Sequence, residues 1–271
     1  MTRPAPVAAP APVAFRHAEH LMGTVFSFAV RPRTTAPAAG LPFEAVLHGI
    51  LTRLHRIDEV FSTYRADSQI RRLERAELTL AQCDPEVAEV LARCREVAAE
   101  TDGWFTHRPA GRLDPSGWVK GWAVEEASLA LSAAGWTEHS VSGGGDVQTS
   151  GGPWRIGIAA PFRPGALLTV LTGHDLAVAT SGIAERGRHI LDPHTGRPAE
   201  GLAALTLTGR RIARTDAWAT AAFAMGPDRA LAWATARPDT EALAVLPDGT
   251  TRITPGLTRY LPGSATASGQ H

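Results

Sequence analysis

The most unusual feature of this 271-residue chain is its lysine content, because Lys120 is the one lysine and arginine is used everywhere else. Lysine carries a compact point charge and arginine a wide planar fork, so they are not equivalent where an ammonium must meet an anion. Lys120 follows Asp114 and Gly117 at the expected start of a helix, where free backbone N–H groups attract phosphate. Together these residues could bind a nucleotide, although each of them alone indicates little about function.

Asp216 and Thr220 offer the oxygen atoms that a hard metal ion prefers. They lie four residues apart in a predicted helix and therefore share one helix face. A carboxylate and a hydroxyl suit Mg²⁺, which keeps few protein ligands and binds phosphates beside them. The structural alternative is an acid near the positive end of a helix dipole, followed by an ordinary threonine. In isolation, the pair favours that alternative.

The segment from His189 to Gly196 is dense in polar residues. Its Asp192-Pro193 step is typical of a tight turn, so much of the segment could be architectural. His189 directly precedes this turn, and its imidazole could act as a general acid or base. His189 and His194 do not have a standard zinc spacing, and no third soft ligand is near them in the sequence.

A glycine-rich segment from Gly143 to Asp146 lies between two expected strands. It matches neither the dinucleotide-binding fingerprint nor the Walker A loop, so the usual nucleotide motifs are absent. The segment is either an ordinary glycine-rich turn or a close backbone approach to a ligand, with Asp146 fixing the loop.

The composition excludes several classes of protein. Lys and Arg together number 27, as do Asp and Glu, and sequence-blind nucleic-acid binding needs a basic surplus. No apolar run approaches the roughly 20 residues of a membrane helix. Cys83 and Cys94 are too few for a disulfide framework or a cysteine-based zinc site. We therefore expect neither nucleic acid nor a membrane span.

The order of the expected elements predicts an α+β fold, because helices dominate early and strands later. Residues 1–15 read as a disordered leader, residues 16–262 as one domain and residues 263–271 as a flexible tail. Apolar residues recur at three- and four-residue steps from Phe43 to Phe61, which predicts the clearest helix. Further helices are expected from Asp84-Pro85, over 118–134, from about 215 to 225 and over 228–236. Strands are expected over 25–30, 140–142, 154–158, 167–171, 176–179 and 203–208, with a closing hairpin over 242–253.

Taken in order, eight short motifs make the chain resemble the ApbE-type FAD:protein FMN transferase family. Each motif is weak alone, but their order and spacing from Met22 to about Ala236 are specific. They are Met22-Gly23-Thr24; Ile57-Asp58 with Phe61-Ser62-Thr63-Tyr64; Gly103-Trp104-Phe105; Leu113-Asp114 with Lys120-Gly121; Gly144-Gly145-Asp146; Thr180-Ser181-Gly182; His189-Ile190-Leu191-Asp192-Pro193 with Thr195-Gly196; and Asp216-Ala217 with Ala219-Thr220.

The resemblance implies a single domain with an antiparallel or mixed sheet packed by helices. It also implies an enzyme that, with Mg²⁺, splits FAD at the pyrophosphate and attaches FMN to a Thr or Ser hydroxyl of a partner flavoprotein, releasing AMP. His189 and Asp216 would be catalytic, and Gly117, Asp216 and Thr220 would hold the metal. The residues that would bind FAD are Met22, Tyr64, Trp104, Phe105, Thr106, Asp114, Lys120, His189 and Ile190.

Two segments depart from the family pattern. Thr106-His107 stands where the family usually has Asp, and the loop from Ile183 to His189 is short and lacks the usual aromatic residues. These departures leave open an FAD-binding protein without turnover. A second alternative is an FAD pyrophosphatase, in which water takes the place of the acceptor and the products are FMN and AMP. Many relatives are exported lipoproteins, whereas the leader shows no signal peptide or lipobox, so the expected location is the cytoplasm.

Overall fold

The computed structural model describes residues 12–32, 41–184, 187 and 189–262. Within them, one eight-stranded sheet has the order β1-β2-β3-β4-β7-β8-β9-β10, and β5 and β6 form a separate two-stranded sheet. All paired strands described are antiparallel. The α+β prediction is confirmed. The strands are β1 (Phe15–Leu21), β2 (Thr24–Val30), β3 (His139–Gly143), β4 (Asp146–Ser150), β5 (Trp154–Ala159), β6 (Leu167–Gly173), β7 (Ala177–Gly182), β8 (Ala204–Gly209), β9 (Glu241–Val245) and β10 (Thr251–Ile253).

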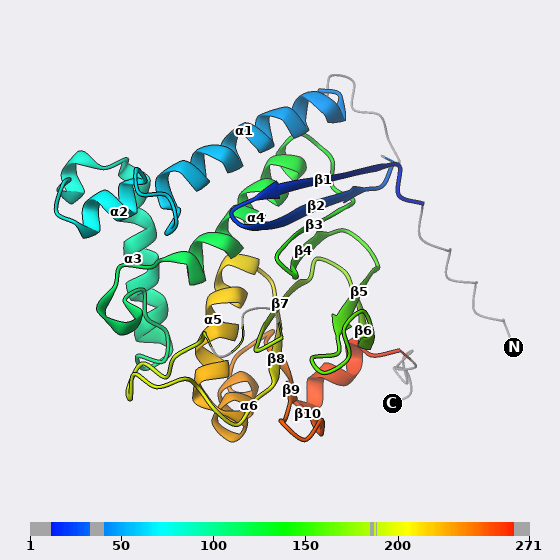
Figure 1. Cartoon of the computed structure of the whole chain (residues 1–271). Helices are drawn as coiled ribbons and strands as arrows, with labels where there is room; N and C mark the ends of the chain where they lie inside the picture. Colours follow the sequence, from blue (N-terminus) through cyan, green and yellow to red (C-terminus); the bar gives the residue numbers. More distant parts are fainter. Residues whose placement is uncertain (1–11, 33–40, 185–186, 188, 263–271) are drawn as a thin grey trace, which may run out of the picture.

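The helices lie mainly on one side of the large sheet, and the β5–β6 hairpin lies on the other (Figure 1). Two of the helices that pack on the sheet, α4 and α5, carry many buried small residues, so they approach the strands and each other closely. The helices are α1 (Phe43–Phe61), α2 (Gln69–Glu74), α3 (Pro85–Glu100), α4 (Ser116–Ala133), α5 (Ile212–Met225) and α6 (Pro227–Thr235), with short 3₁₀ turns at Leu80–Gln82, Pro109–Gly111 and Pro255–Tyr260.

The helices with strong local signals lie where the sequence predicts them. α1 has the predicted bounds, and α3 begins at Pro85 with Asp84 in the N-cap position. Cys94 is a fully buried core residue, and burial raises its pKa to about 12. The other helices differ from their predicted bounds by a few residues. α5 begins at Ile212, so Asp216 lies in the second turn and not at the helix terminus.

The predicted leader is wrong at its C-terminal end, because β1 begins at Phe15. The Ala14 N–H donates to the Val30 carbonyl at 2.8 Å, and the Phe15 ring stacks on Phe43 at 4.8 Å between centroids. β1 pairs with the adjacent strand β2 through a two-residue turn, whereas its contact with α1 is long-range and lies beyond any local pattern. β4 and the short helix α2 were also missed. Residues 1–11 of the predicted leader and the predicted tail 263–271 lie outside the described residues.

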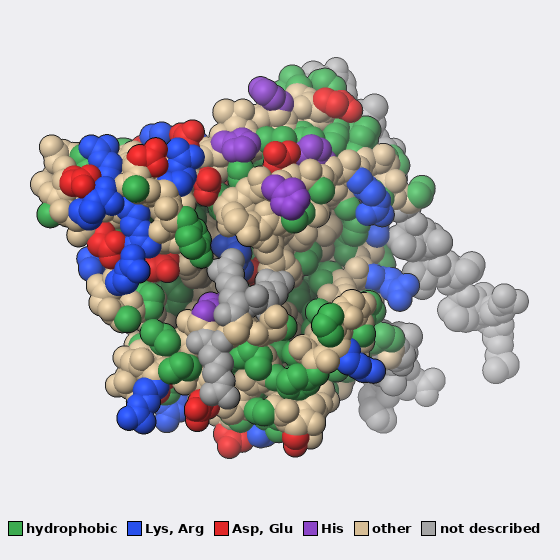
Figure 2. Space-filling model, viewed as in Figure 1, with side chains coloured by type: hydrophobic (Ala, Val, Ile, Leu, Met, Phe, Trp, Pro, Cys, Tyr) green, Lys and Arg blue, Asp and Glu red, His purple; other side chains and the backbone are tan. Residues whose placement is uncertain are grey.

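Charges of both signs mix over the α2 and α3 end of the molecule (upper left in Figure 2). Arg53 pairs with Glu86 there, and Arg56 reaches Asp84 at 2.5 Å. This mixed surface agrees with the balanced composition. No helix among the described residues is long and apolar enough to cross a membrane.

Gly121 is required where α4 crosses α5. A Cβ at this position would lie 2.8 Å from the Ile212 carbonyl oxygen and 2.9 Å from Asp216 Cβ, so backbone would have to move. We predict that Gly121→Ala lowers the free energy of unfolding by about 1–3 kcal/mol, measured by urea denaturation. The matched control is Gly49→Ala in α1, where a Cβ meets nothing within 4 Å. Gly49→Ala should raise the free energy of unfolding by about 0.5–1 kcal/mol. Equal changes in the free energy of unfolding for the two variants would contradict the prediction.

We predict that the burial of His139 makes the folded protein less stable in mild acid. It is wholly buried in β3, with Nε2 2.7 Å from Ser128 Oγ and Nδ1 donating to the Trp136 carbonyl at 2.5 Å. Burial lowers its pKa. Below the ordinary imidazole pKa of about 6.5, His139 therefore binds a proton in the unfolded chain but stays neutral in the folded chain. The free energy of unfolding falls as a result.

The measurement is urea denaturation of the wild type and His139→Gln between about pH 7.5 and about pH 5.5, which spans the ordinary imidazole pKa. The wild type should lose more stability than the variant over this interval. Parallel pH profiles would show that His139 does not cause the loss.

Candidate functional site

A cavity of about 920 Å³ opens between the β1–β2 turn, the end of α1, the start of α4, the loop after β7 and one face of α5. The structure brings every site residue expected from the sequence to its wall. These residues are Met22, Tyr64, Trp104, Phe105, Thr106, Asp114, Gly117, Lys120, His189, Ile190, Asp216 and Thr220. Shared placement makes a common ligand possible, while the individual roles stay predictions.

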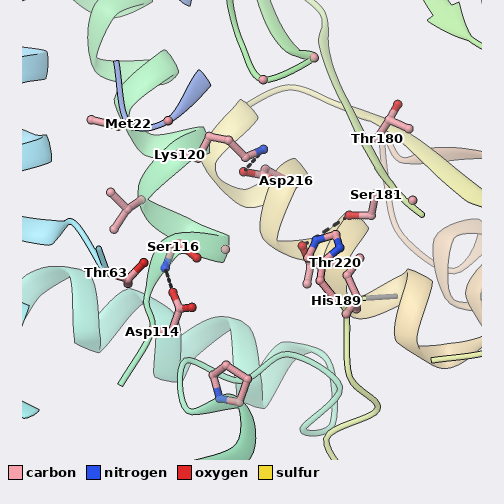
Figure 3. Close-up of a pocket in the computed structure, with 18 of the residues that line it drawn as sticks. Met22, Thr63, Asp114, Ser116, Lys120, Thr180, Ser181, His189, Asp216 and Thr220 are labelled. Atoms are coloured by element: carbon pink, nitrogen blue, oxygen red, sulfur yellow. Dashed lines mark hydrogen bonds and ion pairs between the residues drawn. The ribbon is translucent and has the colours of Figure 1, made fainter. Parts of the chain in front are cut away.

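Lys120 forms the charged centre of the site. Its ammonium makes an ion pair with Asp146 on β4 and lies 3.1 Å from Asp216 Oδ2 on α5 (Figure 3 shows the Asp216 pair). Both carboxylates are almost fully buried, whereas about a quarter of the lysine side chain is exposed. One cation between two carboxylates leaves the centre with an excess negative charge, which favours a further cation.

Asp216 and Thr220 project from the same face of α5, as their four-residue spacing requires. Thr220 Oγ1 lies 3.4 Å from Ser181 Oγ on β7 (Figure 3). The neighbouring donors are therefore hard oxygens, with one carboxylate among them. Among the described residues, no group of three or more His, Cys, Asp or Glu could hold a metal. This donor set fits Mg²⁺ that takes its remaining ligands from phosphate and water, and does not fit a soft-metal site.

The start of α4 presents polar groups to the cavity. Asp114 Oδ1 accepts the Ser116 N–H at 3.0 Å, so this carboxylate pairs with the first backbone N–H of α4 (Figure 3). Gly117 follows directly, and a Cβ there would lie 3.1 Å from the Phe105 ring. Phe105 is almost fully buried, and its ring packs against the start of α4 at the cavity wall.

Two aromatic side chains occupy different parts of the cavity wall. Trp104 contacts His194 edge-on at 4.5 Å between centroids, and the Arg229 guanidinium lies 4.9 Å from its ring centroid. Tyr64 is 86% exposed, so its ring can meet a ligand or a partner at the rim. The Trp104 ring is held from two sides, whereas Tyr64 is free to adapt.

The remaining lining residues show how the backbone forms the wall. Met22 has a φ of 53° and shares the two-residue β1–β2 turn with Gly23, and both residues line the cavity. Thr106 Oγ1 accepts the Arg108 N–H at 3.0 Å. Ile190 is buried, and its carbonyl accepts the Ala199 N–H at 2.9 Å.

His189 is exposed on the loop that follows β7. Its Nδ1 lies 3.1 Å from the Gly187 carbonyl oxygen, which can only accept. Nδ1 therefore carries the hydrogen in this contact, and Nε2 of the neutral ring keeps its lone pair. Nε2 is the atom that can accept a proton. The loop that departs from the family pattern includes residues 185, 186 and 188, which lie outside the described residues.

Sequence reasoning missed part of the wall. Ser181 was noted within a motif but not as a neighbour of Thr220, and the β5–β6 hairpin contributes Gly157 and Pro161 without any motif. Asp58 also lines the cavity, and partial burial raises the pKa of its carboxyl group. The sequence predicts both strands of this hairpin but not their place at the cavity, because that place depends on tertiary packing.

Comparison with known proteins identifies relatives of this chain. The sequence model described as the ApbE family matches residues 22–110 and 105–244. The chain is 34% identical to a FAD:protein FMN transferase of Rhodobacter capsulatus over 160 residues, which are 54% of this chain and 31% of the relative. It is 31% identical to the protein of that name from Vibrio cholerae serotype O1 over 139 residues, 46% of this chain and 42% of the relative. The matched segments thus span less than half of these relatives.

Solved structures show the same fold over almost the whole chain. The flavin transferase ApbE from Vibrio cholerae superposes with a TM-score of 0.78 at 21% identity, over 92% of this chain and 100% of that one. The ApbE protein from Thermotoga maritima superposes with a TM-score of 0.79 at 22% identity, over 91% and 99%. At such low identity these likenesses establish the fold alone.

Proposed function

This chain belongs to the ApbE family, and from that premise we propose that it is an FAD:protein FMN transferase. The observation that carries the proposal is the convergence of Lys120, Asp216 and Thr220 on one cavity whose wall also holds Trp104 and His189. The pyrophosphate of FAD needs a cationic group, a metal ion needs oxygen ligands, and the rings of FAD need aromatic or apolar surfaces. The substrates are FAD and a Thr or Ser hydroxyl of a partner flavoprotein, and the products are the flavinylated protein and AMP.

The reaction exchanges one phosphorus–oxygen bond for another. The acceptor hydroxyl oxygen attacks the phosphorus of the FMN half, and the bond from that phosphorus to the bridging pyrophosphate oxygen breaks. AMP leaves with the bridging oxygen, and the hydroxyl proton must be removed. The anionic phosphates oppose this attack, so positive charge at the cavity wall is the main requirement for catalysis.

The position of each residue in the cavity suggests its role in this reaction. Lys120 places an ammonium at the wall, where it can hydrogen-bond phosphate oxygens. Asp216 and Thr220 would hold Mg²⁺, with the Gly117 carbonyl as a third ligand. When bound, the ion offsets phosphate charge and stabilises the departing AMP. His189 Nε2 would take the acceptor proton or assist the leaving group.

The FAD rings need large apolar surfaces, which the cavity provides in separate places. Trp104 is held by His194 and Arg229, so it can present a fixed face to a ring. Met22 and Ile190 add apolar surface, and Asp114 and Thr106 add polar groups near the start of α4. Tyr64 lies at the rim, where an acceptor protein must approach.

The direct test is incubation of the protein with FAD, Mg²⁺ and candidate partner flavoproteins. Mass spectrometry should show FMN added to the acceptor, and chromatography should show an equal amount of AMP. Release of FMN and AMP without acceptor labelling would identify an FAD pyrophosphatase instead. FAD binding with no AMP under any condition would identify a binding protein without turnover.

We predict that Asp216→Ala reduces AMP release by at least about 100-fold at limiting Mg²⁺, because the ion loses its carboxylate ligand. Thr220→Val should reduce it less, since it removes one neutral oxygen. The control is Asp228→Ala, which removes an exposed carboxylate paired with Arg252 outside the cavity. Full activity of Asp216→Ala at limiting Mg²⁺ would refute the metal assignment.

We also predict that His189→Ala lowers the single-turnover rate of AMP release by roughly 10²–10⁴-fold, the usual value of general acid–base help. FAD should still bind, because the phosphate contacts and aromatic surfaces remain. His189→Asn should not restore the rate, since an amide hydrogen-bonds but does not exchange a proton near neutral pH.

Flavin fluorescence titration and a single-turnover assay separate this role from the alternatives. If His189 only braces the turn, FAD binding and thermal stability fall together. A variant that binds FAD poorly but turns over normally when saturated would make His189 a binding residue.

A further inference from the structure

Asp146 lies behind the cavity wall and contacts two parts of it. It is 1% exposed and is the first residue of β4, directly after the Gly144-Gly145 turn. Its Oδ2 pairs with the Lys120 ammonium, and its Oδ1 accepts the Thr180 N–H at 3.0 Å. Lys120 and Thr180 line the cavity, whereas Asp146 does not. Any effect of Asp146 on a ligand must therefore pass through its neighbours.

The turn before Asp146 also restrains the stem of Lys120. Gly144 has a φ of 58°, and a Cβ there would lie 3.1 Å from Thr24 Oγ1 and 3.4 Å from Lys120 Cδ. The methylene chain is thus packed by the turn while the carboxylate that follows it binds the head group. This arrangement removes most of the freedom of a side chain that is otherwise flexible.

The second carboxylate near Lys120 belongs to the proposed metal site. The ammonium lies 3.1 Å from Asp216 Oδ2 (Figure 3), so it competes with a divalent cation for that oxygen. Asp146 offers an opposing attraction from β4. Without that negative charge, Asp216 would draw the ammonium toward itself and away from phosphates in the cavity.

We propose that Asp146 is a positioning residue, which holds Lys120 between two carboxylates so that its ammonium faces FAD phosphates and Asp216 stays open to the metal. The proposal rests on the proposed function for the identity of the ligand. The proposal and simple charge repulsion predict opposite changes in the affinity for FAD when the charge of Asp146 is removed. Neutralising a carboxylate beside an anion should tighten anion binding, whereas loss of positioning should weaken it.

The substitution Asp146→Asn separates these effects, because the amide oxygen can still accept the Thr180 N–H while the charge on Lys120's partner is lost. The matched control is Glu125→Gln, because the Glu125 carboxylate also pairs with a cationic side chain and also accepts a backbone N–H. Glu125 pairs with Arg211 at 2.6 Å and accepts the Ala213 N–H at 3.2 Å. It lies on α4, as Lys120 does, but outside the cavity wall.

The first experiment measures FAD affinity of the full chain by flavin fluorescence in Mg²⁺, as a double-mutant cycle. Asp146→Asn should weaken FAD binding roughly tenfold, the effect of one charged hydrogen bond. Lys120→Met should weaken it at least as much. The double variant should bind no more weakly than Lys120→Met, because Asp146 acts through Lys120. Unchanged or tighter binding by Asp146→Asn, or multiplied losses in the double variant, would overturn the proposal.

The second experiment observes the lysine directly and needs no FAD. Since the chain has a single lysine, selective ¹⁵N-lysine labelling gives one side-chain ammonium signal by NMR. Loss of a charged hydrogen bond in Asp146→Asn should speed its hydrogen exchange roughly tenfold. Glu125→Gln should leave it unchanged. An identical signal in Asp146→Asn would overturn the proposal. Absence of FMN transfer by the wild type would instead refute only the proposed function.

Discussion

The site depends on one lysine held between two buried carboxylates. Lys120 on α4, Asp146 on β4 and Asp216 on α5 come from three separate elements, and their charges require those elements to meet in one place. A buried carboxylate without a partner is costly, so each acid needs the cation as much as the cation needs them. The ion pairs therefore join the sheet to two helices at the cavity wall.

Close packing of α4 against α5 makes that meeting possible. Gly121 directly follows Lys120, and its missing side chain lets the helix backbone approach Ile212 and Asp216. A larger residue would move the two helices apart and lengthen the distance from Lys120 to Asp216. Glu125 adds a second polar contact between α4 and α5, because its carboxylate pairs with Arg211 and accepts the Ala213 N–H. Helix packing and site electrostatics thus depend on the same small residues.

The chemistry of the proposed transfer follows from this placement. The charged centre lies at the cavity wall, so a substrate with two phosphates meets one ammonium and a cluster of hard oxygens. The rings of the same substrate need surfaces further away, and in the proposed function Trp104 and the apolar wall would supply them. His189 lies on a loop outside the ion-pair centre, with Nε2 available for proton transfer. Charge, ring binding and proton transfer are therefore assigned to different elements of one fold.

The sequence alone determined the features that depend on local spacing. The apolar repeat defines α1 from Phe43 to Phe61, the four-residue step places Asp216 and Thr220 on one face, and the ordered motifs identify the family and the residues of the cavity wall. Tertiary structure alone decided the contact of β1 with α1, the place of the β5–β6 hairpin in the cavity wall, and the position of Lys120 between Asp146 and Asp216. Those features depend on contacts between distant residues, which local periodicity does not encode, because they exist only once the sheet and helices pack together.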